Sequence, residues 1–250
     1  MTEASRSQQV ITRFGTGKQI SILFLISALC LIAFILAIAN GSYQISLTEI
    51  LTDSEQNIQR VVLTEIRLPR VLISCLVGAS LGISGAVLQG LFRNPLADPG
   101  LIGVSAGAAF GASIAIVITP AFIAESSLGV FVLPISGVLG ASFVIALLFV
   151  LTKGFGFQSI TYLLLVGIAV NAIVGVGIGV LTYISTDSEL RTLTFWTMGS
   201  FGGVTWHLIL PAIILISFAI FWTIGLSRKL DLIQLGDAEA SRLGVNIKRL

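Results

Sequence analysis

The amino-acid sequence predicts an all-α protein, a polytopic bundle of about six transmembrane helices. Hydrophobic residues make up 55% of the 250 residues, charged residues only 10%, and the mean hydropathy is +1.02. A soluble domain carries about 25% charged residues, so a soluble protein is excluded. The apolar residues also form six long stretches without Asp, Glu, Lys or Arg. The 26 glycines fit this class, because membrane helices pack closely through small residues.

Each uncharged stretch is long enough to cross a bilayer, which takes roughly 20 apolar residues in a helix. The stretches are 20–39, 71–92, 99–124, 126–152, 154–186 and 208–227. The first follows a basic N-terminus, as in a signal peptide, but its apolar core of about 20 residues exceeds the usual 7 to 15. Further spans also follow it. We therefore interpret it as a transmembrane helix.

The orientation follows from the positive charges, because cytoplasmic loops are enriched in Lys and Arg. Six spans place both chain ends on one side of the membrane. With the N-terminus inside, the inner segments hold Arg6, Arg13, Lys18, Arg93, Lys153, Arg228, Lys229, Arg242, Lys248 and Arg249. The outer segments hold Arg60, Arg67, Arg70 and Arg191. We therefore predict a cytoplasmic N-terminal tail (1–19), a transmembrane domain (20–227) and a cytoplasmic C-terminal segment (228–250).

Glycines at a spacing of four residues predict close helix packing. Gly103, Gly107 and Gly111 leave one face of the third span as bare backbone for a neighbouring helix. The same spacing occurs at Gly78 and Gly82 in the second span and at Gly175 and Gly179 in the fifth.

The polar residues within the spans are neutral. Ion-coupled carriers commonly place carboxylates or broken helices near the membrane midplane, and these spans contain no carboxylate. Energy for any transport is therefore expected to come from another subunit. Gln89 and Asn171 have two interpretations: they form hydrogen bonds between helices, or they line a pathway.

Two prolines, Pro95 and Pro99, interrupt the helix between the second and third spans. Proline lacks an amide donor and disfavours helical geometry in the residue before it. We expect Asn94 and Asp98 to cap local amides in a compact cytoplasmic turn. The segment is either a bare turn or a contact surface for a cytoplasmic partner.

The second span is expected to open at Arg67-Leu68-Pro69-Arg70, on the outer side. Pro69 suits the first turn of a helix, but two cations beside the N-terminal end of a helix dipole are unfavourable. Their outer location also opposes the positive-inside rule. The two arginines either extend to lipid headgroups or form a docking point for an acidic partner.

Residues 187–207 predict a short outer helix followed by a turn. Asp187 or Ser188 is expected to cap this helix, and Glu189 favours its first turn. The sequence also offers glycines that end it and aromatic residues typical of a membrane interface: Gly199, Gly202, Gly203, Phe195, Trp196, Phe201 and Trp206.

No metal site is predicted. His207 is the single histidine, and beside Trp206 it is interpreted as an interfacial residue in preference to a metal or haem ligand. Cys30 and Cys75 lie in apolar spans, where they are expected to be small buried hydrophobic residues that form no disulfide.

The C-terminal segment predicts a miniature helix. Asp237 is the expected N-cap, Glu239 lies in the first turn, Arg242 comes late and Gly244 supplies a left-handed stop. A helix of about six residues is below the 12 to 15 needed for marginal stability alone, so other contacts must hold it. It either docks on a partner or lies on the membrane surface.

Five strings in this order resemble the permease subunits of bacterial ABC importers for iron-siderophore complexes, haem and cobalamin. The strings are Arg67-Leu68-Pro69-Arg70, the segment 78–89 (GASLGISGAVLQ), the segment 94–103 (NPLADPGLIG), the segment 196–203 (WTMGSFGG) and the segment 235–245 (LGDAEASRLGV). The resemblance covers roughly residue 67 to the C-terminus.

The resemblance implies a transport subunit and not an enzyme, located in the bacterial cytoplasmic membrane. In this family two permease copies enclose the path, and two cytoplasmic ATPase subunits drive transport with ATP and Mg²⁺. A periplasmic or lipid-anchored protein delivers the chelate. The permease itself needs no cofactor, and no nucleic-acid partner is implied.

The resemblance also implies roles for residues of this chain. Arg67 and Arg70 would meet acidic residues of the binding protein. Residues of the 228–250 segment would couple the chain to the ATPase: Gly236, Asp237, Glu239, Arg242, Leu243 and Gly244. Gln89 and Asn171 would line the translocation pathway.

The length of the chain departs from the family pattern, since members usually have ten spans. The expected function is import of an iron chelate, siderophore or haem. The alternatives are a cobalamin permease, or a truncated chain that binds the ATPase or a full-length permease without transporting.

Overall fold

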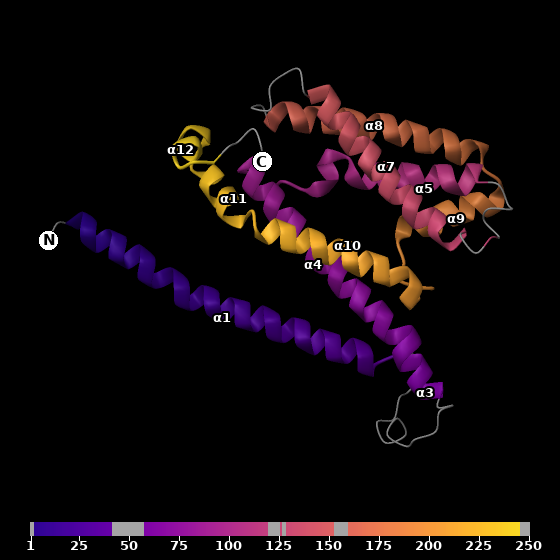
Figure 1. Cartoon of the computed structure of the whole chain (residues 1–250), viewed down its shortest axis with the longest axis horizontal. Helices are drawn as coiled ribbons and strands as arrows, with labels where there is room; N and C mark the ends of the chain where they lie inside the picture. The colour runs from indigo at the N-terminus through magenta and orange to yellow at the C-terminus, as the bar shows by residue number, and fades with distance from the viewer. Residues whose placement is uncertain (1–2, 42–57, 120–125, 127–128, 153–159, 246–250) are drawn as a thin grey trace. The chain divides into compact units, whose positions relative to one another are not determined.

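The computed structural model describes residues 3–41, 58–119, 126, 129–152 and 160–245, and all regular structure in these ranges is helical (Figure 1). The predicted all-α class is confirmed. The α-helices are α1 (Glu3–Ala39), α3 (Ile58–Val61), α4 (Leu68–Phe92), α5 (Val104–Ile118), α7 (Gly129–Thr152), α8 (Ile160–Ile184), α9 (Asp187–Met198), α10 (Trp206–Ile224), α11 (Ser227–Gln234) and α12 (Asp237–Arg242). A π-helix, η1 (Val62–Arg67), precedes α4, and a 3₁₀ helix, η2 (Pro99–Ile102), precedes α5.

Five helical segments in the described ranges are long and apolar enough to cross a membrane: Gly17–Ala39, Ile58–Phe92, Gly129–Thr152, Tyr162–Ile184 and Trp206–Ile224. They match five of the six predicted spans. The third predicted span, 99–124, is shorter as a helix, because α5 covers only Val104–Ile118 and residues 120–125 lie outside the described ranges. The start of the fifth predicted span, 154–159, also lies outside them.

The chain divides into two compact units, which are described separately. The first consists of Met1–Cys75 and Gly203–Ile209, and the second of Leu76–Gly202 and Leu210–Leu250.

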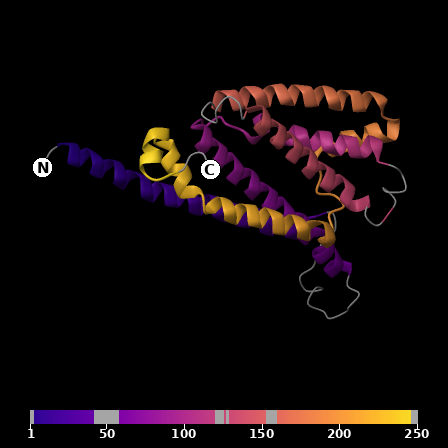
Figure 2. The same cartoon turned by 45° about the horizontal axis from the view of Figure 1, so that its top comes forward.

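In the second unit, α5 packs against α7 and α8 (Figures 1 and 2). The predicted glycine face of α5 forms the contact with α7. A Cβ atom added to Gly107 would lie 2.7 Å from the Gly140 carbonyl oxygen, and one added to Gly111 would overlap the Ser136 carbonyl oxygen. The prediction is confirmed for Gly107 and Gly111, and Gly140 of α7 is their partner. It is wrong for Gly103, which precedes α5 in a left-handed conformation and is not part of the helical face.

Branched side chains fill the space between α7 and α8. Val144 of α7 is 1% exposed and clusters with Val170 and Val174 of α8. Phe110 of α5 packs against this cluster, close to Gly177 of α8, whose added Cβ would lie 2.7 Å from the Phe110 ring. The close approach of these helices therefore depends on glycine on one side and on branched or aromatic side chains on the other.

The other two predicted glycine faces are open. A Cβ atom added at any of these four glycines would meet no atom of the described residues within 4 Å: Gly78, Gly82, Gly175 and Gly179. These faces do not mediate packing within the described part of the chain.

In the first unit, the helix before α4 begins earlier than the sequence predicted. The expectation that Pro69 opens the second span is wrong, because helical structure runs from Ile58 and is π-helical over Val62–Arg67. The Leu68 amide donates to the Leu63 carbonyl, five residues back. In this i to i−5 pattern, the Thr64 carbonyl would accept the amide of residue 69, but Pro69 has no amide hydrogen. The indole Nε1 of Trp206 donates to that carbonyl at 3.0 Å.

Candidate functional site

Arg67 is buried in the first unit, where it binds the end of α1. It is 8% exposed, and its Nη1 donates to the Ile38 carbonyl at 2.9 Å and to the Ala39 carbonyl at 3.2 Å. The last carbonyls of a helix lack intrahelical donors and carry partial negative charge, so a guanidinium there is favourable. This contact explains why a cation occupies a position that looked unfavourable in the sequence.

Arg67 and Arg70 are not equivalent in the structure. Pro69 is fully buried and Arg70 is exposed. The expectation that both arginines start a helix is corrected, since both lie in a continuous helical segment. Of the two predicted docking residues, only Arg70 presents its side chain at the surface, and its contact with a partner stays a prediction.

The turn between α4 and α5 is capped by its own side chains, as predicted. Asn94 Oδ1 accepts the Leu96 amide at 2.9 Å, and Asp98 Oδ1 accepts the Gly100 amide at 2.6 Å. Asp98 is thereby the N-cap of η2. Gly103 then adopts a φ of 93°, in the left-handed region, and α5 begins at Val104.

Asn171 of α8 forms a hydrogen bond with η2, the 3₁₀ helix that precedes α5. Its Nδ2 donates to the Gly100 carbonyl at 3.1 Å, while its Oδ1 is buried without a hydrogen-bond partner among the described residues. The same oxygen lies 3.1 Å from where a Cβ of Gly103 would be. The hydrogen-bonding interpretation is confirmed for Asn171, and its part in a pathway stays a prediction.

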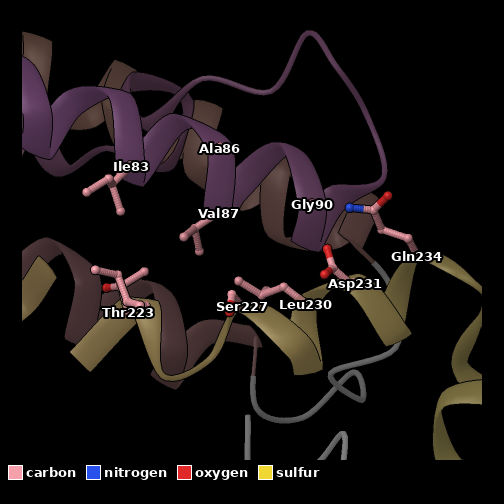
Figure 3. Close-up of a pocket in the computed structure, with 10 residues that line it drawn as sticks. Ile83, Ala86, Val87, Gly90, Thr223, Ser227, Leu230, Asp231 and Gln234 are labelled. Atoms are coloured by element: carbon pink, nitrogen blue, oxygen red, sulfur yellow. The ribbon is translucent and has the colours of Figure 1, made fainter. Parts of the chain in front are cut away.

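Gln89 is exposed and lines a groove at the C-terminal end of α4 in the second unit. This groove, of about 420 Å³, is also lined by Arg93, Asn94 and Gln234. It adjoins a second groove of about 340 Å³ between α4 and the segment formed by α10 and α11. In Figure 3, Ile83 and Val87 of α4 face Thr223 and Leu230 across the second groove, and Gln234 reaches toward Gly90.

The α11–α12 segment is a small module held by its own apolar contacts. Ile233 of α11 is 3% exposed and packs with Ala240 and Val245. The helix α12 ends in the predicted left-handed glycine, with Gly244 at a φ of 88°. The Gly244 amide donates to the Ser241 carbonyl at 3.1 Å and the Val245 amide to the Ala240 carbonyl at 3.0 Å, which is a Schellman motif.

Two predicted N-caps are displaced by one residue or more. Gly236, with a φ of 108°, is the N-cap of α12, so Asp237 is its first helical residue. The N-cap of α9 is Thr186, not Asp187 or Ser188, and it forms a capping box with Glu189. The spacing from threonine to glutamate was present in the sequence and could have identified this cap.

Arg93 is the residue at this site that the sequence analysis missed. It follows the last residue of α4, and its Nε donates to the Ile233 carbonyl of α11 at 2.9 Å. The two residues are 140 positions apart in the chain. No local pattern in the sequence predicts such a contact.

The described residues contain no group of three or more His, Cys, Asp or Glu side chains that could hold a metal ion. The expectation that Cys30 and Cys75 are buried is wrong, because both are exposed on the described part of the chain. His207 is also exposed.

Comparison with known proteins identifies the family. The sequence profile of the FecCD transport family matches residues 29–250. The hemin transport system permease protein HmuU of Yersinia pestis is 39% identical over 209 residues, which cover 84% of this chain and 62% of that protein. The vitamin B12 import system permease protein BtuC of Escherichia coli is 36% identical over 235 residues, which cover 94% of this chain and 68% of that protein. The molybdate import system permease protein MolB of Haemophilus influenzae is 34% identical over 238 residues, which cover 92% of this chain and 68% of that protein.

A solved structure of a metal-chelate type ABC transporter in an inward-facing conformation has the same fold. The two structures superpose with a TM-score of 0.77 at 33% sequence identity. The matched region covers 92% of this chain and 69% of the chain in the solved structure. The chain spans 62 to 68% of the length of the curated relatives named above. With its helical spans, its capped turn at 94–100 and its C-terminal module, this multi-pass membrane protein belongs to the FecCD transport family.

Proposed function

We propose that the chain is the transmembrane permease subunit of an ATP-driven importer in the bacterial cytoplasmic membrane, with its N-terminus in the cytoplasm. The family match over residues 29–250 carries this proposal. The absence of Asp, Glu, Lys and Arg from the six apolar stretches supports an external energy source, because no carboxylate is available there for a coupling ion.

The ATPase is proposed to bind the α11–α12 module. The module is too short to be stable as an isolated helix pair, and it exposes Leu235 (63%) and Leu243 (57%). Exposed leucines on a segment predicted to face the cytoplasm suit an apolar pocket of a partner. Gly236 and Gly244 shape the turns on either side of α12, and Glu239 and Arg242 form an exposed ion pair at 2.8 Å. Asp237 begins the helix.

On the outer side, Arg70 is proposed to meet acidic residues of a periplasmic or lipid-anchored binding protein. A second copy of the permease is proposed to complete the translocation path. The open glycine faces at Gly78, Gly82, Gly175 and Gly179 support such an assembly, because small residues allow close helix contact.

The cargo is proposed to be an iron chelate, with haem ahead of a siderophore. The relative that is 39% identical is a hemin permease, whereas the vitamin B12 and molybdate permeases are 36% and 34% identical. Cobalamin is the alternative cargo.

Uptake measurements test this function directly. The chain is expressed with the ATPase and binding protein of its own genome in cells that lack a haem permease. Uptake of labelled haem, ferric siderophore and cobalamin is then compared. We expect uptake of the iron chelate that stops when the catalytic glutamate of the ATPase is substituted. Normal membrane insertion and ATPase binding without uptake of any cargo would contradict transport and favour the binding-only alternative.

A further inference from the structure

The side chain of Arg93 connects the end of α4 to the module that is proposed to bind the ATPase. Arg93 lies directly after Phe92, the last residue of α4, and its Nε donates to the Ile233 carbonyl at 2.9 Å. Both residues belong to the second unit, so this contact is internal to one compact body.

The Arg93 backbone is held in an unusual conformation. Its φ of 50° is the only positive value for a non-glycine residue in the described ranges. The chain is fixed in this turn by the Arg93 amide, which donates to the Gly90 carbonyl at 3.3 Å, and by the Asn94 amide, which donates to the Gln89 carbonyl at 3.2 Å. Conformations of this kind are retained where the surroundings over-determine them, and they occur often at functional sites.

The acceptor is well suited to a cation. The Ile233 carbonyl is near the C-terminal end of α11, where helix carbonyls carry partial negative charge. The same oxygen also accepts the Gly236 amide at 3.0 Å, at the junction between α11 and α12. Arg93 therefore binds the point at which the two helices of the module join.

The module moves with Ile233, because the Ile233 side chain packs with Ala240 and Val245 of the α12 segment. On the other side, Arg93 continues from a helix that carries Gln89 in its last turn. Gln234 of α11 lies close to this bond, since a Cβ on Gly90 would be 3.6 Å from Gln234 Nε2.

We propose that Arg93 is a positioning residue that transmits displacement of the α11–α12 module to α4. This inference rests on the proposed function, in which the module binds the ATPase, and on the prediction that Gln89 of α4 lines the path. A charge-assisted hydrogen bond is stronger than a neutral one, and this bond links the two segments directly, whereas the groove beside it leaves them apart. Arg93 itself contacts neither cargo nor ATP.

The test uses the complete transporter, with ATPase and binding protein, in proteoliposomes. Arg93→Met keeps the length of the side chain and removes its donors. We expect uptake per ATP hydrolysed to fall about ten-fold, while the ATPase still co-purifies at the wild-type ratio. Arg93→Lys, which retains a cationic donor, should recover part of this loss. Arg191→Met is the matched control, because Arg191 is exposed on α9 and does not belong to the module, and it should leave the ratio unchanged.

A second measurement does not depend on the cargo. With Cys30 and Cys75 replaced by serine, the labelling rate of Gln89→Cys is measured with and without ATP in the permease–ATPase complex. The ATP-dependent change should disappear in Arg93→Met and persist in Arg191→Met. An unchanged labelling response in Arg93→Met, or loss of ATPase binding in that variant, would overturn the inference. Failure of the wild-type complex to import cargo would instead count against the proposed function.

Discussion

The indole of Trp206 replaces an amide that Pro69 lacks: its Nε1 donates to the Thr64 carbonyl at 3.0 Å. In the π-helical turn over Val62–Arg67, this carbonyl would otherwise have no main-chain donor. A tryptophan that the sequence suggests is an interfacial residue therefore also completes the hydrogen bonding of a helix 142 positions away.

Trp206→Phe should destabilise the protein. Phenylalanine keeps most of the apolar bulk but leaves the Thr64 carbonyl without a donor, which costs about 1–3 kcal/mol when the group is buried. The free energy of unfolding in detergent measures the effect. Trp222→Phe on the same helix is the control, because Trp222 is 67% exposed. Equal stability of both variants would mean that the indole bond contributes nothing.

Gly111→Ala should separate α5 from α7. The new methyl group would overlap the Ser136 carbonyl and approach Gly140 Cα to 3.0 Å. Overpacking of this kind costs about 1–3 kcal/mol. Gly85→Ala on α4 meets no atom of the described residues within 4 Å and should be neutral or stabilise its helix by up to about 1 kcal/mol. Thermal unfolding of the two variants in the same detergent compares them, and a stable Gly111→Ala would refute the backbone contact.

Arg67→Met should loosen the end of α1. Loss of the bonds to the Ile38 and Ala39 carbonyls removes a charge-assisted cap of about 1.5–3 kcal/mol. Amide hydrogen exchange at Asn40, whose amide donates to the Leu36 carbonyl, reports the fraying. Arg60→Met, which removes an exposed arginine, should leave that exchange rate unchanged. If both variants exchange alike, Arg67 does not act as a cap.

Arg70→Glu should weaken binding of the partner protein on the outer side. Reversal of an exposed charge at the edge of an interface mainly lowers the association rate, by about ten-fold at low salt, and less at high salt. Surface plasmon resonance at two ionic strengths measures this rate. Arg191→Glu controls for a general change in surface charge, since Arg191 is exposed on α9. An association rate independent of Arg70 would remove it from the docking surface.

Gly244→Ala should disturb the α12 module. Position 244 has a φ of 88°, where a side chain costs about 1–2 kcal/mol. The strain should shift the Schellman motif and reduce co-purification of the ATPase. Gly244→Asn is the matched variant, because asparagine tolerates left-handed geometry better than alanine. Co-purification that is equally strong for both variants and the wild type would show that the cap is not required for docking.

The sequence was most informative where a local pattern determines the structure. Apolar length predicted the spans, the spacing of Gly107 and Gly111 predicted a close helix contact, and Gly244 predicted the stop of α12. The capping by Asn94 and Asp98 was predictable because an Asx side chain reaches the amide two residues ahead. The interactions involved are strong within a few residues, so distant parts of the chain do not alter them.

Contacts between distant segments were not predictable in this way. The bonds from Arg67 to α1, from Arg93 to Ile233 and from Trp206 to Thr64 join residues 28 to 142 positions apart. Their acceptors are main-chain carbonyls, which are present at every residue and leave no mark in the sequence. The π-helix was missed for a related reason, since Pro69 alone favours the simpler interpretation of a helix start.

The seam between α5 and α7 has a consequence for motion during a transport cycle. At Gly107, Gly111 and Gly140 the two helices touch through main-chain atoms, which cannot rotate away as side chains can. The pair must therefore travel as a single rigid block. A rearrangement within the second unit is therefore expected to leave the α5–α7 pair intact and to occur at its other helix contacts.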